Sequence, residues 1–152
     1  MANYRRIFLD GYSYFITVVT HGRKPILIEH IDLLRESFRE SKRYYSYSIG
    51  AISVMPDHFH MIITPHNAKD YPKIIKSIKY NFTKRYQSED DVLQSFSRYK
   101  RKMQPIWQKR YYEHTIRDQN DWDKKIDYIK NNPIKHGLAE VWSDWKYSSF
   151  GL

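Results

Sequence analysis

Two histidines separated by one phenylalanine, His58-Phe59-His60, are the residues of this chain best suited to chemistry. Successive side chains of an extended strand point to opposite faces, so the two imidazoles are predicted to share a face. Neutral imidazole is a common ligand of divalent metal ions, and two of them make half of a metal site. On spacing alone, a packing or surface role for the pair stays open.

A tyrosine and an asparagine further along the chain could complete such a site. Tyr128 and Asn132 are spaced i and i+4, so on a helix their side chains lie one above the other. Trp122, Ile126 and Ile129 form the apolar stripe of the same predicted helix, and Tyr128 lies beside this stripe. A hydroxyl presented there can act as a nucleophile toward phosphorus. The alternative is a half-buried aromatic side chain without a chemical role.

The ligand set predicted from these residues is two nitrogens, from His58 and His60, and one amide oxygen, from Asn132. Such a set leaves coordination positions open and suits Mg²⁺ or Mn²⁺, with the imidazoles favouring Mn²⁺. A divalent ion would polarise a scissile phosphate while the tyrosine forms a covalent intermediate. Asn132 could instead be an ordinary helix end before Pro133. His136 is an alternative ligand, although its place before a glycine also fits a loop.

The composition favours a nucleic-acid partner. The chain has 152 residues, a formal net charge of +9 and 14 tyrosines. Lysine and arginine neutralise phosphates, and flat rings stack on unpaired bases, although a basic surface can also be merely solvated. The candidate DNA-binding residues are Arg5, Arg6, Lys73, Lys76, Lys79, Arg98, Lys100, Arg101, Lys102, Trp107 and Arg110.

The composition also excludes several classes of protein. The absence of cysteine rules out disulfides, thiolate catalysis and cysteine-ligated zinc. No run approaches the ~20 apolar residues of a membrane span, and the N-terminus lacks the apolar run of a signal peptide. We therefore expect one domain over residues 1–152, located in the cytoplasm and in no contact with a membrane.

The pattern of apolar residues predicts an α+β fold. β-Branched and aromatic runs predict strands over residues 12–20, 45–55, 58–64 and 107–116. Helical periodicity predicts helices over residues 31–43, from Pro72 onward, and over residues 121–132, the last ending at Pro133. Residues 88–104 fit an exposed loop or irregular helix, and an aromatic tail, residues 142–150, is expected to pack back on the domain. The order is that of a ferredoxin-like βαββαβ antiparallel sheet with an added C-terminal helix that carries Tyr128.

Four blocks of this sequence resemble those of a known family. Residues 55–63 (MPDHFHMII) are similar to the histidine-hydrophobe-histidine ("HUH") motif of single-strand DNA endonucleases. Residues 107–117 (WQKRYYEHTIR), 127–138 (DYIKNNPIKHGL) and 144–150 (DWKYSSF) resemble segments of the REP-associated tyrosine transposases. The likeness spans nearly the whole chain, and the blocks occur in the order of the family.

The resemblance implies a specific chemistry. In this family the two histidines, here His58 and His60, bind a divalent cation, and a residue at the position of Asn132 can complete the site. A helix tyrosine, here Tyr128, attacks single-stranded DNA and leaves a 5′-phosphotyrosine and a free 3′-hydroxyl. The REP-associated branch acts on short palindromic repeats of bacterial chromosomes, which implies hairpin DNA as the partner and a nucleoid-associated location. In the mobile branch, dimers exchange the tyrosine helix, so the sequence leaves monomer or homodimer open.

Three other interpretations remain open at this level. The first is a fully mobile insertion-sequence transposase, which matched ends around the gene would indicate. The second is a non-catalytic hairpin-DNA-binding regulator with the same fold, although it would have no need for all of His58, His60 and Tyr128. The third is a hydrolytic metallonuclease that uses metal-bound water, and it would keep its cleavage activity without Tyr128.

Overall fold

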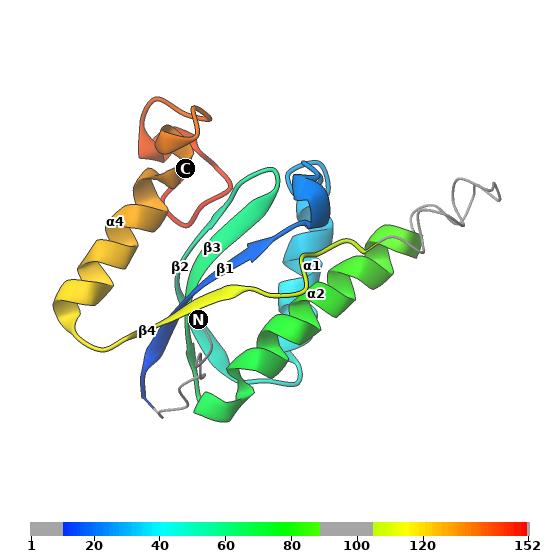
Figure 1. Ribbon diagram of the computed structural model, residues 1–152, viewed down its shortest axis with the longest axis horizontal. Helices are drawn as coiled ribbons and strands as arrows, with labels where there is room; N and C mark the ends of the chain where they lie inside the picture. The colour runs from blue at the N-terminus through cyan, green and yellow to red at the C-terminus, as the bar shows by residue number, and fades with distance from the viewer. Residues whose placement is uncertain (1–10, 89–104, 152) are drawn as a thin grey trace.

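The computed structural model describes residues 11–88 and 105–151, which form a sheet with helices on both faces (Figure 1). The strands and helices are β1 (Ser13–Val19), α1 (Ile31–Lys42), β2 (Tyr47–Val54), β3 (His58–Pro65), α2 (Tyr71–Ser88), β4 (Tyr112–Ile116) and α4 (Gln119–Lys135). Three 3₁₀ turns accompany them, η1 (His21–Arg23), η2 (Ala68–Asp70) and η3 (Trp142–Asp144).

The sheet has the strand order β2-β3-β1-β4, and each neighbouring pair is antiparallel. This order and the sequence of elements from β1 to β4 confirm the predicted ferredoxin-like fold. Helices α1 and α2 cover one face of the sheet and α4 covers the other (Figure 1). The histidine strand, β3, is central, so its side chains are enclosed on both faces.

The alternation of side chains along β1 and β3 produces two separate apolar clusters. Tyr14, Ile16 and Val18 of β1 pack in the larger cluster with Phe59 of β3 and the helices α1 and α2. The side chains between them point to the other face, where Phe15 packs in the smaller cluster below α4. The members of this smaller cluster are Phe15, Ala51, Ile62, Ile116 and Ile129. It is the surface on which the C-terminal helix rests.

Helix α4 fits closely against β2 at a glycine. The register between β2 and β3 shifts between Ile49 and Ala51, which makes Gly50 the irregular residue. A Cβ atom at Gly50 would lie 2.6 Å from Cη2 of Trp122. Only glycine therefore leaves room for this indole against the strand. Two helical turns after Trp122, Ile129 of the same helix is fully buried. The predicted core stripe of α4 does face the sheet.

The predicted end of this helix was wrong, because α4 passes through Pro133 and ends at Lys135. Proline lacks the N–H that would bond to Ile129, but helical hydrogen bonding continues beyond it, where His136 donates to the carbonyl of Asn132 at 3.1 Å. The helix then closes through bonds from Gly137 to Ile134 and from the following Leu138 to Pro133. Gly137 has a φ of 71°, so these bonds form the Schellman motif that ends many helices.

The fourth strand is shorter than predicted, Tyr112–Ile116 in place of residues 107–116. Trp107 makes only an isolated bridge with Thr20, and its indole is buried in the larger apolar cluster. The aromatic run before Tyr112 predicts a strand because large apolar side chains are common in strands, but they are equally common in packed connections. The predicted connection over residues 88–104 lies outside the described residues except at Ser88, which ends α2.

The aromatic tail packs back on the domain, as predicted. It runs along the edge strand β2, where Val54 donates to the carbonyl of Tyr147 and Ser149 donates to that of Ile52, each at 2.9 Å. The indole of Trp145 also donates to the carbonyl of Val54 at 2.9 Å. The tail thus satisfies backbone groups that an edge strand would otherwise expose.

Candidate active site

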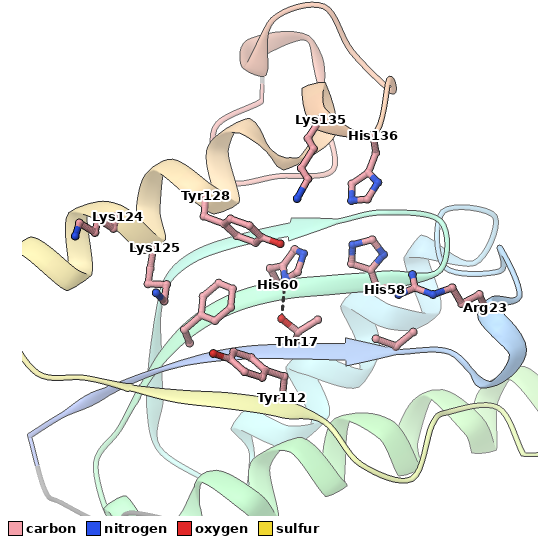
Figure 2. A pocket seen from close by; sticks show the side chains of 12 residues that line it. Thr17, Arg23, His58, His60, Tyr112, Lys124, Lys125, Tyr128, Lys135 and His136 are labelled. Atoms are coloured by element: carbon pink, nitrogen blue, oxygen red, sulfur yellow. Dashed lines mark hydrogen bonds between the residues drawn. The ribbon is translucent and has the colours of Figure 1, made fainter. Parts of the chain in front are cut away.

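A cavity of about 640 Å³ lies between α4 and the sheet and is lined by His58, His60 and Tyr128, whereas Asn132 is buried and is not part of its lining (Figure 2). His58 and His60 reach it from β3, and Tyr128 reaches it from α4. The full lining is Phe15, Thr17, Val19, Arg23, His58, His60, Tyr112, Lys124, Lys125, Tyr128, Lys135 and His136. The fold thus brings together two segments that are seventy residues apart in the chain.

Hydrogen bonds that run from His58 through Asp57 to Arg23 fix the orientation of the His58 ring. Its Nδ1 donates to Oδ1 of Asp57 at 2.6 Å, and Arg23 donates to the other carboxylate oxygen at 3.1 Å. Burial raises the pKa of Asp57, but the hydrogen bonds from His58 and Arg23 outweigh it and leave the pKa lowered. Asp57 is therefore a carboxylate at neutral pH, and because Nδ1 of His58 is bonded to it, Nε2 is the ring nitrogen left for a ligand.

Arg23, the partner of Asp57, has an unusual backbone conformation. Its φ is 52°, in the left-handed region that residues other than glycine rarely adopt. Strained conformations of this kind persist where the surrounding structure holds them. Here the side chain is held by the ion pair with Asp57, which connects turn η1 to the start of the histidine strand.

His60 is fixed by its neighbour in the sheet. Thr17 is the register partner of His60, and the hydroxyl of Thr17 is 2.7 Å from Nδ1 of the imidazole. Burial, and then the charges of His58 and His136, lower the pKa of His60 to about 3. The ring is therefore neutral, and a hydrogen bond from Nδ1 to Thr17 leaves a lone pair on Nε2.

Unpaired polar atoms mark the place where a metal ion fits. Nε2 of His60 and both amide atoms of Asn132 are buried without a hydrogen-bond partner among the described residues. Such groups are costly to bury, and an unsatisfied set of this kind requires an explanation. The Asn132 amide approaches His60 closely enough to raise the pKa of His60, against the stronger effects that lower it, but its geometry falls short of a hydrogen bond, so the two side chains are unbonded neighbours. One imidazole nitrogen and one amide oxygen in this position are suitable donors for a divalent ion.

A third titratable side chain does not join the two histidines in the part of the chain that the structure describes. Within residues 11–88 and 105–151, no three His, Cys, Asp or Glu side chains are grouped so that they could hold a metal ion. His136 caps α4, and its ring lies 5.2 Å from that of His58, at the mouth of the same cavity. His136 therefore lies close to the site. Among the described residues, it does not form a three-histidine group with His58 and His60. The donor set that fits remains His58, His60 and Asn132.

Tyr128 faces these donors. Its ring centroid is 5.1 Å from that of His60 and 5.7 Å from that of Phe15, which meets the tyrosine edge-on. The residue is 42% exposed, so its hydroxyl is accessible from the cavity rather than buried with the core. The position beside the apolar stripe, predicted from the helical spacing, produces this combination of a packed ring and an open hydroxyl.

Comparisons with known proteins identify the family. The family model described as "Transposase IS200 like" matches residues 9–132. A candidate REP-associated tyrosine transposase of Haemophilus influenzae is 39% identical over 99% of this chain and 86% of its own length. A REP-associated tyrosine transposase of Escherichia coli is 33% identical over 99% of this chain and 83% of its own. The chain belongs to the IS200-like transposases.

A solved structure supports the same assignment for this transposase. The structure of a REP-associated tyrosine transposase bound to a REP hairpin matches with a TM-score of 0.80 at 33% identity. The match covers 99% of this chain and 83% of the other. The family resemblance drawn from the four sequence blocks is thereby confirmed.

Several charged residues of the transposase cavity were missed by the sequence reasoning. Arg23, Lys124, Lys125 and Lys135 line it, and none was among the predicted DNA-binding residues. A signal was available for three of them. Lys124, Lys125 and Lys135 are at i−4, i−3 and i+7 from Tyr128, which places them on the same face of one helix. Arg23 is brought in by turn η1, which no helical spacing could indicate.

The predicted DNA-binding residues of the transposase lie elsewhere. Lys73, Lys76 and Lys79 are on α2, across the sheet from the cavity, and Arg110 is exposed before β4. Lys79 donates to the carbonyl of Gln108 at 3.0 Å, and burial lowers its pKa. The residues Arg5, Arg6, Arg98, Lys100, Arg101 and Lys102 lie outside the described residues.

The stacking role predicted for Trp107 is wrong. Its side chain is 7% exposed, packs edge-on against Phe59 and Phe82, and donates through Nε1 to the carbonyl of Lys79 at 3.1 Å. No ring face is left for a nucleobase. Tryptophan serves equally well in cores and at binding surfaces, and the sequence around it does not distinguish the two.

Proposed function

We propose that this transposase is a metal-dependent single-strand DNA endonuclease and strand transferase that acts on hairpin DNA through Tyr128. The observation that carries the proposal is the meeting of the Tyr128 ring with His60, 5.1 Å apart, in one open cavity with His58. The relative with a solved structure is described as bound to a REP hairpin, which supports a hairpin of palindromic-repeat DNA as the substrate.

The residues themselves account for the steps of cleavage. The cleft between α4 and the sheet admits a single strand, and its lysines attract the phosphates. The oxygen of Tyr128 attacks phosphorus, the bond from phosphorus to the 3′-oxygen breaks, and that oxygen leaves with the electron pair. The products are a 5′-phosphotyrosine and a free 3′-hydroxyl, so the bond energy is kept for rejoining to a second strand.

His58, His60 and Asn132 would hold a divalent cation, Mg²⁺ or Mn²⁺. When bound, the cation would supply Lewis acidity to the scissile phosphate. The bonds of Asp57 to His58 and of Thr17 to His60 hold both rings in the orientation and tautomer that a ligand requires. Asn132 would contribute a neutral oxygen, so the site would keep a net positive charge toward an anionic substrate when the cation is bound.

The test uses a labelled single-stranded oligonucleotide with a palindromic hairpin and unpaired flanks from the organism's own genome, with and without Mn²⁺. The expected product on a denaturing gel is a Mn²⁺-dependent band shifted by the mass of the protein. Tyr128→Phe should abolish this band, and Tyr112→Phe, a tyrosine of the same cavity, should retain it. An undiminished adduct in Tyr128→Phe would show that another residue is the nucleophile.

The other outcomes separate the rival functions. Cleavage that persists in Tyr128→Phe without any adduct would indicate a hydrolytic nuclease. Hairpin binding that is independent of metal, with no cleavage under any ion, would indicate a regulator. For the leading proposal we expect the protein in the cytoplasm, associated with the nucleoid as its substrate requires. The gel-filtration mass of the hairpin complex decides between monomer and homodimer.

A further inference from the structure

Lys135 lies over the proposed nucleophile. It is seven residues after Tyr128, two turns along the same face of α4, and its Nζ is 5.6 Å from the centroid of the tyrosine ring. Figure 2 shows the ammonium pointing down from the helix into the space between Tyr128 and His136. The side chain is exposed and lines the cavity. It can therefore reach a phosphate placed beside the hydroxyl.

The charge of Lys135 is available for a substrate. Arg23 is paired with Asp57 at 3.1 Å, and Lys125 is paired with Asp121 at 3.4 Å. For Lys135, as for Lys124, no acidic side chain of the described part of the chain lies within ion-pairing distance, and of these two only Lys135 lies over the Tyr128 ring.

A purely structural role would explain part of this arrangement. Lys135 is in the last turn of α4, where a cation interacts favourably with the helix dipole. That effect accounts for a basic residue at this end of the helix. It does not require the side chain to turn toward Tyr128, nor the ammonium to lack an acidic partner.

We propose that the ammonium of Lys135 contacts the scissile phosphate beside the hydroxyl of Tyr128 and neutralises the charge on its nonbridging oxygens. The inference rests on the proposed function and adds a catalytic residue to it. In the attack, the phenolic proton passes to water, the bond from the tyrosine oxygen to phosphorus forms, and the bond to the 3′-oxygen breaks. The 3′-oxygen takes its proton from water. Lys135 keeps its own protons throughout and acts only through its charge and hydrogen bonds.

The first measurement is the single-turnover rate of adduct formation with the labelled hairpin and Mn²⁺. Lys135→Gln should lower this rate about 100-fold, the usual effect of removing one group that stabilises transition-state charge. Lys135→Arg should restore most of the rate because it restores the charge. The matched control is Lys130→Gln on the same helix, since Lys130 lies 4.3 Å from the ring centroid of Trp142 and does not line the cavity.

The second measurement is equilibrium binding and does not depend on cleavage. Each phosphate contact to a single strand contributes about 0.7 to the slope of log affinity against log salt. Lys135→Gln should reduce the slope by about that amount, and Lys130→Gln should leave it unchanged. A series of hairpins with one uncharged methylphosphonate each should contain one linkage that weakens binding of the wild-type protein but not of Lys135→Gln.

The two measurements separate failure of this inference from failure of the proposed function. Absence of any adduct with the wild-type protein would refute the covalent chemistry, while the methylphosphonate series would still show whether Lys135 holds a phosphate. An unchanged adduct rate in Lys135→Gln would overturn the inference. So would an equal loss in Lys135→Arg with an unchanged salt slope, because that pattern would indicate a structural role for the lysine at the helix end.

Discussion

Replacement of Gly50 by alanine should displace the helix that carries the nucleophile. The new Cβ would lie 2.6 Å from Cη2 of Trp122 and 3.1 Å from Cζ2, whereas ordinary contacts begin at 3.4 Å. The indole must therefore retreat by about 0.8 Å. The ring is partly buried against the smaller apolar cluster, so we expect α4 to move with it.

The expected cost combines two opposing effects. Overpacking of a well-packed contact costs about 1–3 kcal/mol. Where the backbone permits it, exchange of glycine for alanine stabilises by about 0.4–1 kcal/mol through the unfolded chain. The net loss in the free energy of unfolding should be roughly 1–2 kcal/mol. A shift of Tyr128 by nearly 1 Å should also slow adduct formation by up to about 100-fold.

The assay is urea unfolding followed by circular dichroism, applied to a double-mutant cycle. Trp122→Phe removes Cη2 and Cζ2, so Gly50→Ala should cost much less in that background. We expect the double variant to be more stable than the sum of the single effects by about 1 kcal/mol or more. Additive effects, or a Gly50→Ala variant as stable as the wild-type protein, would refute the argument that Gly50 makes room for the indole.

The other predictions concern single contacts. Thr17→Val should weaken Mn²⁺ binding about 10–100-fold in calorimetry, because Nδ1 of His60 loses the partner that orients the ring; equal affinity would contradict this. Asp121→Asn should lower the free energy of unfolding by about 1 kcal/mol at pH 7. Burial raises the pKa of Asp121, but the hydrogen bond from His114 outweighs it, so this stability is complete above the ordinary pKa of 3.8 and lost as the pH falls through the lower folded value. Urea unfolding curves that keep the difference at pH 2 would exclude that cause. Gly137→Ala should lower Tm by about 2–4 °C, since its φ of 71° strains any residue with a Cβ, and Gly137→Asn should lose less; equal losses would contradict this.

The pattern of the sequence was sufficient for the architecture. Alternation along residues 58–64 and the helical spacing after residue 121 each assign side chains to a face, and this assignment depends only on backbone geometry. His58 and His60 therefore lie together on β3, and Tyr128 lies beside the apolar stripe of α4, as predicted. The ends of the elements were harder to predict, because the continuation of α4 past Pro133 depends on a closing motif formed by Gly137 and Leu138, four and five residues later.

The environment of the site depended on contacts between segments distant in the chain. The bond between Thr17 and His60 follows from the register of β1 against β3, which a single strand does not encode. Arg23 reaches Asp57 through a turn with an unusual φ, and the basic residues of α2 are separated from the cavity by the sheet itself. The residue type of Trp107 does not indicate whether its side chain is buried in the core or exposed for binding.

The sequence by itself determined which residue types are present, which face of each element they occupy and the order of those elements, because these follow from local backbone periodicity. Only the tertiary structure decided which faces meet: α4 against β3, Lys135 over Tyr128, and Asn132 beside His60. The physical reason is that such contacts depend on packing, as at Gly50 and Trp122, where the absence of one Cβ atom leaves room for an indole of α4 against β2.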